Sequence, residues 1–385
     1  MYKQFYSRFL AENKGTQHYA CHSHYFWPDV TRQAMLDYWD DSARYVDGKW
    51  AYFFDTLVPE LQQAISARLN TSCPEQIVFA PNTHELLFRI ISCLDISKPL
   101  HIVTTDSEFH SFYRQSNRLA EQASITVTQV PVKPIESFAE RFKAAVADIP
   151  ADMVFFSQVF FNSGFALNDI ESIVNAVPDP DTLVVVDGYH QFMARPTDIR
   201  ALESRIFYLA GSYKYAQGGE GACFAHIPKG CALRPVYTGW FAEFGALDKP
   251  REGEVSYSTD GMRFAGATMD FTALYRLRAV INLFDSHSIT QSDIHTHVQS
   301  IQAHFLSTLF ALKHPLLNAS TLMVSDAERR GHFLAFELPD ASQTAELAHM
   351  LKANGILTDY RDNRLRFGFA LYHEAGDIDL SVLHK

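Results

Sequence analysis

Short apolar runs and stretches of helical periodicity alternate along the chain from about residue 55 to 230. Apolar residues recur every four positions at Leu57, Leu61, Ile65 and Leu69, which predicts a helix with one buried face. Short runs rich in apolar and β-branched residues predict strands at 77–79, 102–105, 125–132, 153–156, 183–186 and 206–209. This alternation is typical of βαβ units and predicts a mostly parallel sheet.

The pattern changes after residue 230. Helical periodicity covers 268–284 and 294–312, and strands are predicted at 333–337 and 365–369, on either side of a helix near 344–352. With 385 residues, the chain is long enough for two domains. We therefore predict an α/β chain with a large domain over residues 50–285. A small α+β domain is expected from residues 1–49 and 286–385.

Composition narrows the class of protein. Hydrophobic residues make up 47% and charged residues 20%, which is ordinary for a soluble globular enzyme. The net charge of −11 leaves no basic cluster, so nucleic acid is not an expected partner. The N-terminus lacks the apolar core of a signal peptide and no segment is apolar enough to span a bilayer, which predicts a cytoplasmic protein without a membrane partner. Five scattered cysteines without CxxC spacing, and no HExxH pattern, argue against a disulfide framework and a metal site.

Chemistry-bearing residues follow two of the predicted strands. Asp187-Gly188-Tyr189-His190 comes directly after the run at 183–186, and Gly211-Ser212-Tyr213-Lys214-Tyr215 comes after the run at 206–209. The carboxyl ends of parallel strands meet at one edge of the sheet, where ligands bind in open α/β folds. Taken singly, Asp187 or Lys214 is more often structural than catalytic, but the whole set favours a site.

This set suits pyridoxal phosphate (PLP). A partly desolvated lysine such as Lys214 loses its proton readily and forms a Schiff base with an aldehyde. An aspartate such as Asp187 keeps the pyridine nitrogen protonated, which makes the ring an electron sink. His190 is expected either to lie on the ring or to hydrogen-bond its phenolic oxygen.

A phosphate site is predicted between the strand at 77–79 and the helix that follows it. Asn82 and Thr83 stand at the N-terminus of this helix, where free backbone amides attract anions. The same residues also suit a plain helix N-cap, and the geometry serves both roles.

The motifs resemble those of fold-type-I PLP enzymes of the class V aminotransferase superfamily, and kynureninase most closely. The resemblance is carried by Ser212-Tyr213-Lys214-Tyr215, by Asp187-Gly188-Tyr189-His190 and by Gly239-Trp240-Phe241. It implies a large domain with a seven-stranded type of mostly parallel sheet, a small α+β domain, and a homodimer with the site at the interface. It also implies that Lys214 holds the cofactor, that Asp187 faces its pyridine nitrogen and that Tyr213 binds its phosphate.

Further site residues follow from the same resemblance. Ser157 stands where a serine contacts the cofactor, and Phe109 where an aromatic ring stacks on it. Trp240 and Thr268 are expected to reach the phosphate of the other subunit. Arg366 falls where an arginine grips the substrate α-carboxylate, and a bidentate guanidinium suits that group. His24 is expected to line the substrate site.

Departures from kynureninase affect the substrate more than the cofactor. They fall at His22 to His24, Val46, Phe112 and Thr268, which replace residues of the family's pattern. The first function predicted is a PLP-dependent hydrolase that cleaves a Cβ–Cγ bond of an amino acid. The alternative is a class V aminotransferase. A cysteine desulfurase is disfavoured because the last cysteine, Cys231, lies only seventeen residues after Lys214, and a non-catalytic PLP-binding protein is disfavoured because Lys214 and Asp187 occur together.

Overall fold

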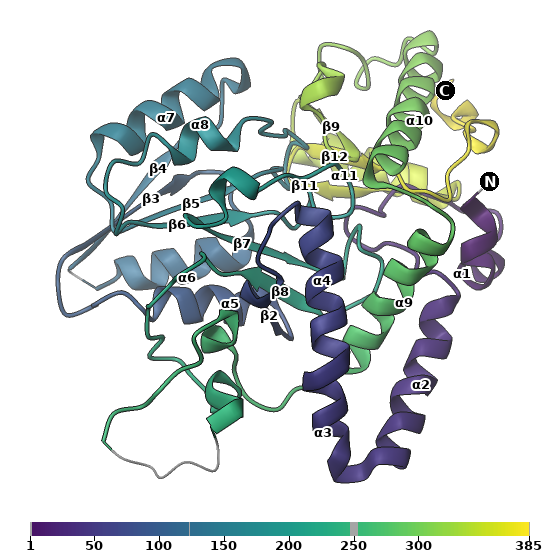
Figure 1. Cartoon of the computed structure of the whole chain (residues 1–385). Coiled ribbons are helices and arrows are strands. Elements are labelled where there is room, and N and C mark those ends of the chain that lie inside the picture. The colour runs from purple at the N-terminus through teal and green to yellow at the C-terminus, as the bar shows by residue number, and fades with distance from the viewer. Residues whose placement is uncertain (1, 123, 247–252, 385) are drawn as a thin grey trace.

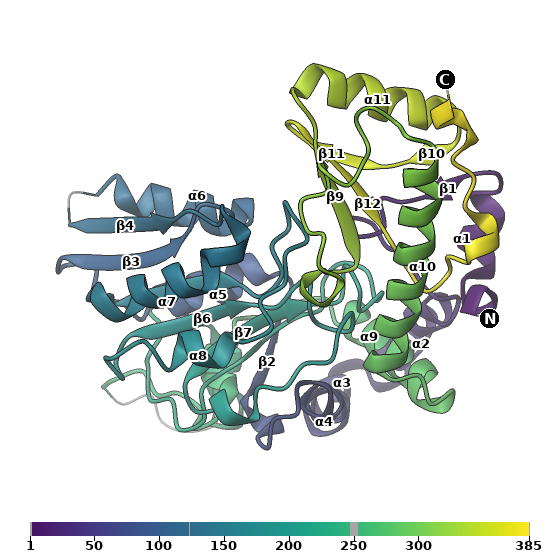
Figure 2. The same cartoon turned by 90° about the horizontal axis from the view of Figure 1, so that it is seen from above.

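A seven-stranded sheet forms the centre of the larger domain (Figures 1 and 2). The computed structural model describes residues 2–122, 124–246 and 253–384. The sheet has the order β2-β8-β7-β6-β5-β3-β4, and within it β8 alone runs antiparallel to its neighbours. Its strands are β2 (Ile77–Ala80), β3 (Leu100–Thr105), β4 (Ile125–Val130), β5 (Met153–Ser157), β6 (Leu183–Asp187), β7 (Ile206–Gly211) and β8 (Cys223–His226). The predicted α/β fold with a mostly parallel sheet is therefore confirmed.

The apolar runs form strands because both faces of the sheet are covered. Val184, Val185 and Val186 in β6 have no exposed surface, as expected for a parallel strand between helices. β4 ends at Val130, two residues earlier than predicted, because Pro131 has no amide hydrogen for the ladder.

Helices pack around this sheet. They are α2 (Val30–Tyr45), α3 (Lys49–Tyr52), α4 (Val58–Leu69), α5 (Thr83–Ile91), α6 (His110–Ala120), α7 (Phe138–Asp148), α8 (Ile170–Val174) and α9 (Thr272–Ser286). A π-helical turn over Phe53–Leu57 joins α3 to α4, so the predicted helix is longer than its periodicity indicated. α9 begins four residues later than predicted, where Asp270 accepts a hydrogen bond from the Thr272 amide.

A second, smaller core lies in the upper lobe of Figure 2. Its antiparallel sheet has the order β11-β12-β9, and β1 pairs in parallel with β10 beside it. The strands are β1 (Gln17–His18), β9 (Phe333–Glu337), β10 (Ile356–Leu357), β11 (Asp359–Arg361) and β12 (Arg364–Gly368), and the helices are α10 (Gln291–Ala311) and α11 (Ala341–Ala353). Phe305, Phe336 and Phe367 fill the space between them.

The N-terminal segment contributes to both cores. α1 (Ser7–Glu12) precedes β1, and Tyr19 packs into the smaller core. α2 packs along α9, and its Ala34 belongs to the larger core. The domain limits at 49/50 and 285/286 remain a prediction.

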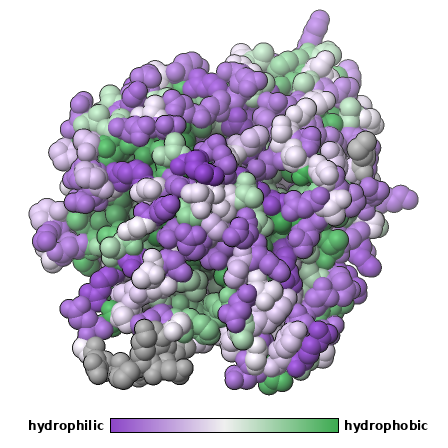
Figure 3. All heavy atoms as spheres, viewed as in Figure 1, coloured by the Kyte–Doolittle hydropathy of each residue, from purple (hydrophilic) through white to green (hydrophobic). Residues whose placement is uncertain are grey.

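The surface view in Figure 3 is mostly hydrophilic, with apolar residues in small patches. Among the helices of the described residues, none combines the length and apolar character that crossing a bilayer requires.

Candidate active site

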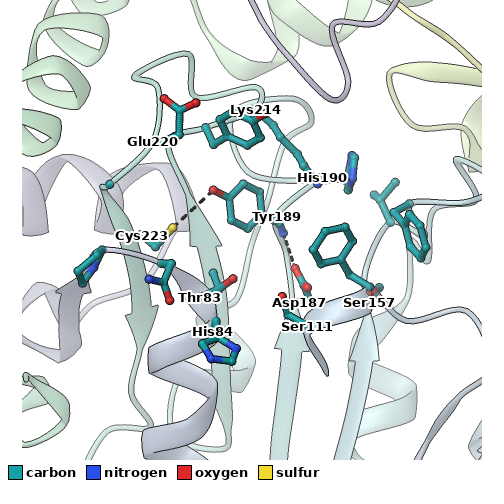
Figure 4. A pocket seen from close by; sticks show the side chains of 17 residues that line it. Thr83, His84, Ser111, Ser157, Asp187, Tyr189, His190, Lys214, Glu220 and Cys223 are labelled. Carbon is teal, nitrogen blue, oxygen red and sulfur yellow. Dashed lines mark hydrogen bonds between the residues drawn. The ribbon is translucent and has the colours of Figure 1, made fainter. Parts of the chain in front are cut away.

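Three neighbouring strands end at one cavity of about 280 Å³ (Figure 4). Ser157 ends β5, Asp187 is its register partner at the end of β6, and the loop after β7 brings Lys214 over the same edge. The lining residues are Pro81, Asn82, Thr83, His84, Phe109, Ser111, Ser157, Val159, Phe161, Asp187, Tyr189, His190, Tyr213, Lys214, Glu220, Gly221 and Cys223. The cavity thus lies where the carboxyl ends of the parallel strands meet, the edge at which the sequence predicted a site.

Asp187 forms the floor of the cavity. Its carboxylate accepts a hydrogen bond from the Tyr189 amide at 2.8 Å, and burial raises its pKa above the ordinary value while the nearby Lys214 cation acts in the opposite direction. The next residue must be glycine, because a Cβ on Gly188 would lie 2.0 Å from the Tyr208 ring. The absence of a side chain at Gly188 therefore lets the chain after Asp187 pass close to the Tyr208 ring of β7.

Lys214 contacts a histidine rather than a carboxylate. Its Nζ lies 2.7 Å from His190 Nε2. It also lies 5.2 Å from the ring centroid of Phe109 and 5.0 Å from that of Tyr189. Burial lowers the pKa of Lys214 to about 8, against the opposing attraction of Asp187. Burial and the Lys214 charge also hold the His190 pKa well below its usual range, so the imidazole is neutral. The amine is thus prepared for reaction as a base or nucleophile.

The opposite side of the cavity is formed by the N-terminus of α5. The Asn82 side chain accepts a hydrogen bond from the Glu85 amide at 2.8 Å, so it acts as the N-cap, while Thr83 begins the helix at the cavity wall. The Tyr213 hydroxyl lies 2.5 Å from Nδ1 of His24, which brings His24 to the rim. The helix amides at this end of α5 and the Tyr213 hydroxyl are donors of the kind that bind anions.

Four of the predicted residues lie outside the cavity lining: His24, which contacts it through Tyr213, and Trp240, Thr268 and Arg366. Trp240 and Thr268 contact each other, with Trp240 Nε1 donating to Thr268 Oγ1 at 3.3 Å, and Trp240 is 39% exposed. Arg366 is buried and committed elsewhere: its guanidinium donates to the carboxylate of Asp359 and to the Phe161 carbonyl, both at 2.5 Å. Phe161 lines the cavity, so Arg366 stands one residue behind its wall.

Two of the positions at which the chain departs from kynureninase also lie away from the cavity. Phe112 stacks on Phe155 in the core at a ring separation of 3.7 Å, and Val46 is 68% exposed after α2. His22 is fully buried, with its ring stacked on Phe333, and its Nε2 lies 3.6 Å from Asp359. Of these three departures, His22 is the one linked to Arg366, through Asp359.

The sequence reasoning missed several site residues. Tyr189 and Cys223 line the cavity and contact each other at 3.5 Å between hydroxyl and Sγ, and Glu108 is buried against Ser157. Tyr189 precedes His190 and Glu108 precedes Phe109, both of which were predicted, so their positions in the sequence next to site residues could have indicated them. Cys223 had none, because its place depends on β8 returning antiparallel to β7.

The residues present fit PLP. The cavity is lined by an aldehyde-reactive amine, a half-buried carboxylate and the N-terminus of α5. His190 Nδ1 is buried without a hydrogen-bond partner among the described residues. Within the same residues no group of three or more acidic, histidine or cysteine side chains is arranged to hold a metal ion.

This fold, with a lysine and an aspartate at the ends of adjacent strands, defines a fold-type-I PLP protein. The sequence profile of the family described as aminotransferase class-V matches residues 29–360. The chain therefore belongs to the class V aminotransferase family, and it is a PLP-dependent enzyme of that family. The superfamily predicted from the motifs is confirmed, whereas the closer resemblance to kynureninase is not.

The named relatives are cysteine desulfurases and a cystine C–S lyase, not kynureninases. A cysteine desulfurase of Pectobacterium atrosepticum is 20% identical over 284 residues, which span 72% of this chain and 66% of that enzyme, just under two thirds of its length. A mutant of C-DES with glycine covalently linked to its PLP superposes with a TM-score of 0.76 at 18% identity, over 100% of this chain and 97% of the other. The cystine C–S lyase C-DES, in complex with its product cysteine persulfide, gives 0.77 at 18% identity, over 94% and 95%. At this identity the two structures support the fold alone.

Proposed function

We propose that this enzyme removes the Cα proton of an amino acid with Lys214 and then breaks a bond at Cβ. The observation that carries the proposal is the Lys214 amine, which contacts a neutral His190 at 2.7 Å in the same cavity as the Asp187 carboxylate. With a pKa of about 8, the amine exchanges a proton readily near neutral pH. The lowered pKa matches the requirement of a general base.

The other residues would hold the reactants. Bound PLP supplies the electron sink for a carbanion at Cα. Asp187 would keep the pyridine nitrogen protonated, and the N-terminus of α5 with Tyr213 would bind the phosphate. The exposed ring of Phe109 would cover one face of the cofactor. His190, neutral and in contact with Lys214, would keep the amine oriented toward the cavity.

The cysteines favour a reaction that needs no enzyme thiol. Among the described residues that line the cavity, Cys223 is the one cysteine, and burial raises its pKa to about 11. Cys231 follows β8, which starts at the cavity and runs away from it, so this thiol lies toward the opposite edge of the sheet. A relay through a cysteine nucleophile is therefore disfavoured, although relatives are named cysteine desulfurases.

Within this class we rank hydrolysis of a Cβ–Cγ bond first, because the motifs around Lys214 and Asp187 resemble those of kynureninase. Direct elimination of a Cβ–S bond is the second member, since it needs no enzyme thiol and the C-DES structures share the fold. Transamination remains the alternative from another class. Transamination would use the same Lys214 to remove the Cα proton, and it differs in that Lys214 then delivers this proton to the cofactor while no bond at Cβ is broken.

A substrate panel separates these reactions. Purified enzyme with PLP is offered kynurenine, 3-hydroxykynurenine, cystine and several amino donors. An anthranilate product with alanine supports Cβ–Cγ hydrolysis, and pyruvate with a persulfide supports Cβ–S elimination. Conversion of bound PLP to the pyridoxamine form, without either set of products, would refute Cβ cleavage and establish transamination. Lys214→Ala is the control and should abolish all three outcomes.

We also propose a homodimer whose interface includes Trp240. Around this residue the surface carries further exposed apolar side chains, with Val236 83% and Tyr237 46% exposed, and Phe88 packs edge-on against Tyr237. A group of exposed apolar side chains close together in the chain is typical of an interface. Sedimentation of the holoenzyme tests the dimer, and a monomer at micromolar concentration would contradict it.

A further inference from the structure

Glu108 is a buried acid that the proposed chemistry does not use. It lies between β3 and α6, is 6% exposed and was not among the predicted site residues. Its Oε1 accepts hydrogen bonds from the Thr105 hydroxyl at 2.7 Å and from the Ser157 amide at 3.1 Å. Its Oε2 has one contact, the Ser157 hydroxyl oxygen at 2.5 Å. Both oxygens are thus directed at β3 and β5, where the strands end.

The contact with Ser157 can hold one proton in either of two ways. If Glu108 is ionised, the Ser157 hydroxyl donates to it, and the serine presents lone pairs alone to the cavity. If Glu108 is protonated, its Oε2 donates to Ser157 Oγ, and the serine proton is released. Ser157 lines the cavity, so that proton then points toward the cofactor.

The surroundings favour the protonated acid. Ser157 is the register partner of Asp187, and the Asp187 carboxyl group, which is half-buried, is near enough to Glu108 for its charge to act on it. Two neighbouring carboxylates cannot both be ionised cheaply away from water. Burial, with Asp187 adding to it against the hydrogen bonds from Ser157 and Thr105, raises the pKa of Glu108 to about 8. Asp187 from β6 is the charged group facing Glu108, while Thr105 of β3 and Ser157 of β5 are neutral.

We propose that Glu108 is a positioning residue which, as a neutral acid, donates to Ser157 and thereby directs the serine hydroxyl proton into the cofactor cavity. The proposal rests on the PLP site and not on which bond at Cβ is broken. A donating hydroxyl beside Asp187 suits an acceptor atom of the bound cofactor. An ionised Glu108 reverses the hydroxyl and removes this donor.

The amide of glutamine imitates the neutral acid at every contact. Its oxygen can accept from Thr105 and the Ser157 amide, while its NH₂ donates to Ser157 Oγ. Cofactor affinity, measured by fluorescence titration of cofactor-free protein, is therefore expected to stay within about twofold in Glu108→Gln. Glu108→Ala and Ser157→Ala should each weaken it about tenfold, and the double variant no further than Ser157→Ala, because both act through one hydroxyl. Glu121→Gln, at an exposed acid, is the matched control.

A second measurement requires no cofactor or activity. The infrared band of a protonated carboxylic acid should be present at pH 7 in cofactor-free protein, disappear as the pH rises through about 8, and be absent from Glu108→Gln. The titration of Lys214 affects cofactor affinity in both proteins over this range, so the test is the ratio: the affinity of the wild type should fall relative to that of Glu108→Gln as the pH rises through about 8. An affinity of Glu108→Gln as low as that of Glu108→Ala, or failure of Glu108→Gln to fold, would overturn the proposal. Because both readouts are taken without substrate, they stand even if the reaction assignment fails.

Discussion

The amine of Lys214 should react in the cofactor-free protein with a pKa of about 8 instead of 10.5. Burial against the rings of Phe109 and Tyr189 removes water from the ammonium, which disfavours the charged form. The Arg366 guanidinium lowers the pKa of Lys214 further by repulsion. The attraction of Asp187 raises this pKa but does not cancel the effects of burial and Arg366.

This shift changes the shape of a pH profile. With a pKa of about 8, the neutral fraction of the amine is about 9% at pH 7, about 50% at pH 8 and about 99% at pH 10. A solvated lysine with a pKa near 10.5 rises from about 0.03% to about 0.3% and then to about 24%. The rate of imine formation at Lys214 should therefore level off above pH 9, while that of a solvated lysine continues to climb.

Limited labelling with pyridoxal measures both profiles in one sample. Imines are fixed by borohydride and the modified peptides are quantified by mass spectrometry, with the exposed Lys229 as the internal control. A Lys214 profile that rises in parallel with that of Lys229 between pH 8 and 10, by about 80-fold, would refute the reasoning. Unlabelled Lys214 at pH 9 would do so as well.

The same shift predicts a change in stability. Because the folded pKa lies below the unfolded one, the folded state binds fewer protons between about pH 8 and 10.5. The free energy of unfolding of the cofactor-free protein should therefore rise across that range, and the penalty of the buried charge is fully present below pH 8. Lys214→Met removes this penalty and should raise the free energy of unfolding at pH 7 by at most about 3 kcal/mol. Urea denaturation at pH 7 and 10 measures it.

Three further predictions concern the surroundings of the cavity. Arg366→Ala should raise the KM for the amino acid about tenfold or more. Asp359→Asn should lower the KM, because the guanidinium now bound by Asp359 would become available to the substrate. An unchanged KM in both variants would show that the pair takes no part in substrate binding. Cys223, with a pKa of about 11, has a thiolate fraction of about 0.1% at pH 8 and should resist alkylation there, whereas rapid labelling would revive a thiol mechanism. Mixing inactive Lys214→Ala and Trp240→Ala subunits should restore up to about a quarter of the wild-type activity if Trp240 serves the partner's phosphate; recovery no greater than the sum of the two variants measured separately would show that it does not.

Much of the larger domain was predictable from local patterns. Strands that are buried on both faces, such as β6 and β7, are apolar along most of their length, so their positions were predicted to within two residues at their ends. Asp187 ends β6, and the loops that follow β6 and β7 carry His190 and Lys214. The rule that parallel strands end at one edge was enough to bring the three together. The placement of the N-terminal segment was harder to predict, because Tyr19 and Ala34 pack into different cores. Periodicity shows which face of a helix is buried but not which element covers it.

The sequence by itself determined the cofactor class, since a lysine and an aspartate at adjacent strand ends are a local consequence of the βαβ order. Only the tertiary structure decided what surrounds them. It placed Glu108 behind Ser157, Cys223 under Tyr189 and Asp359 on Arg366, each through contacts between residues separated by 7 to 49 positions along the chain. Pairings of this kind depend on sheet order and on how closely the elements pack, and no periodicity along the chain records them.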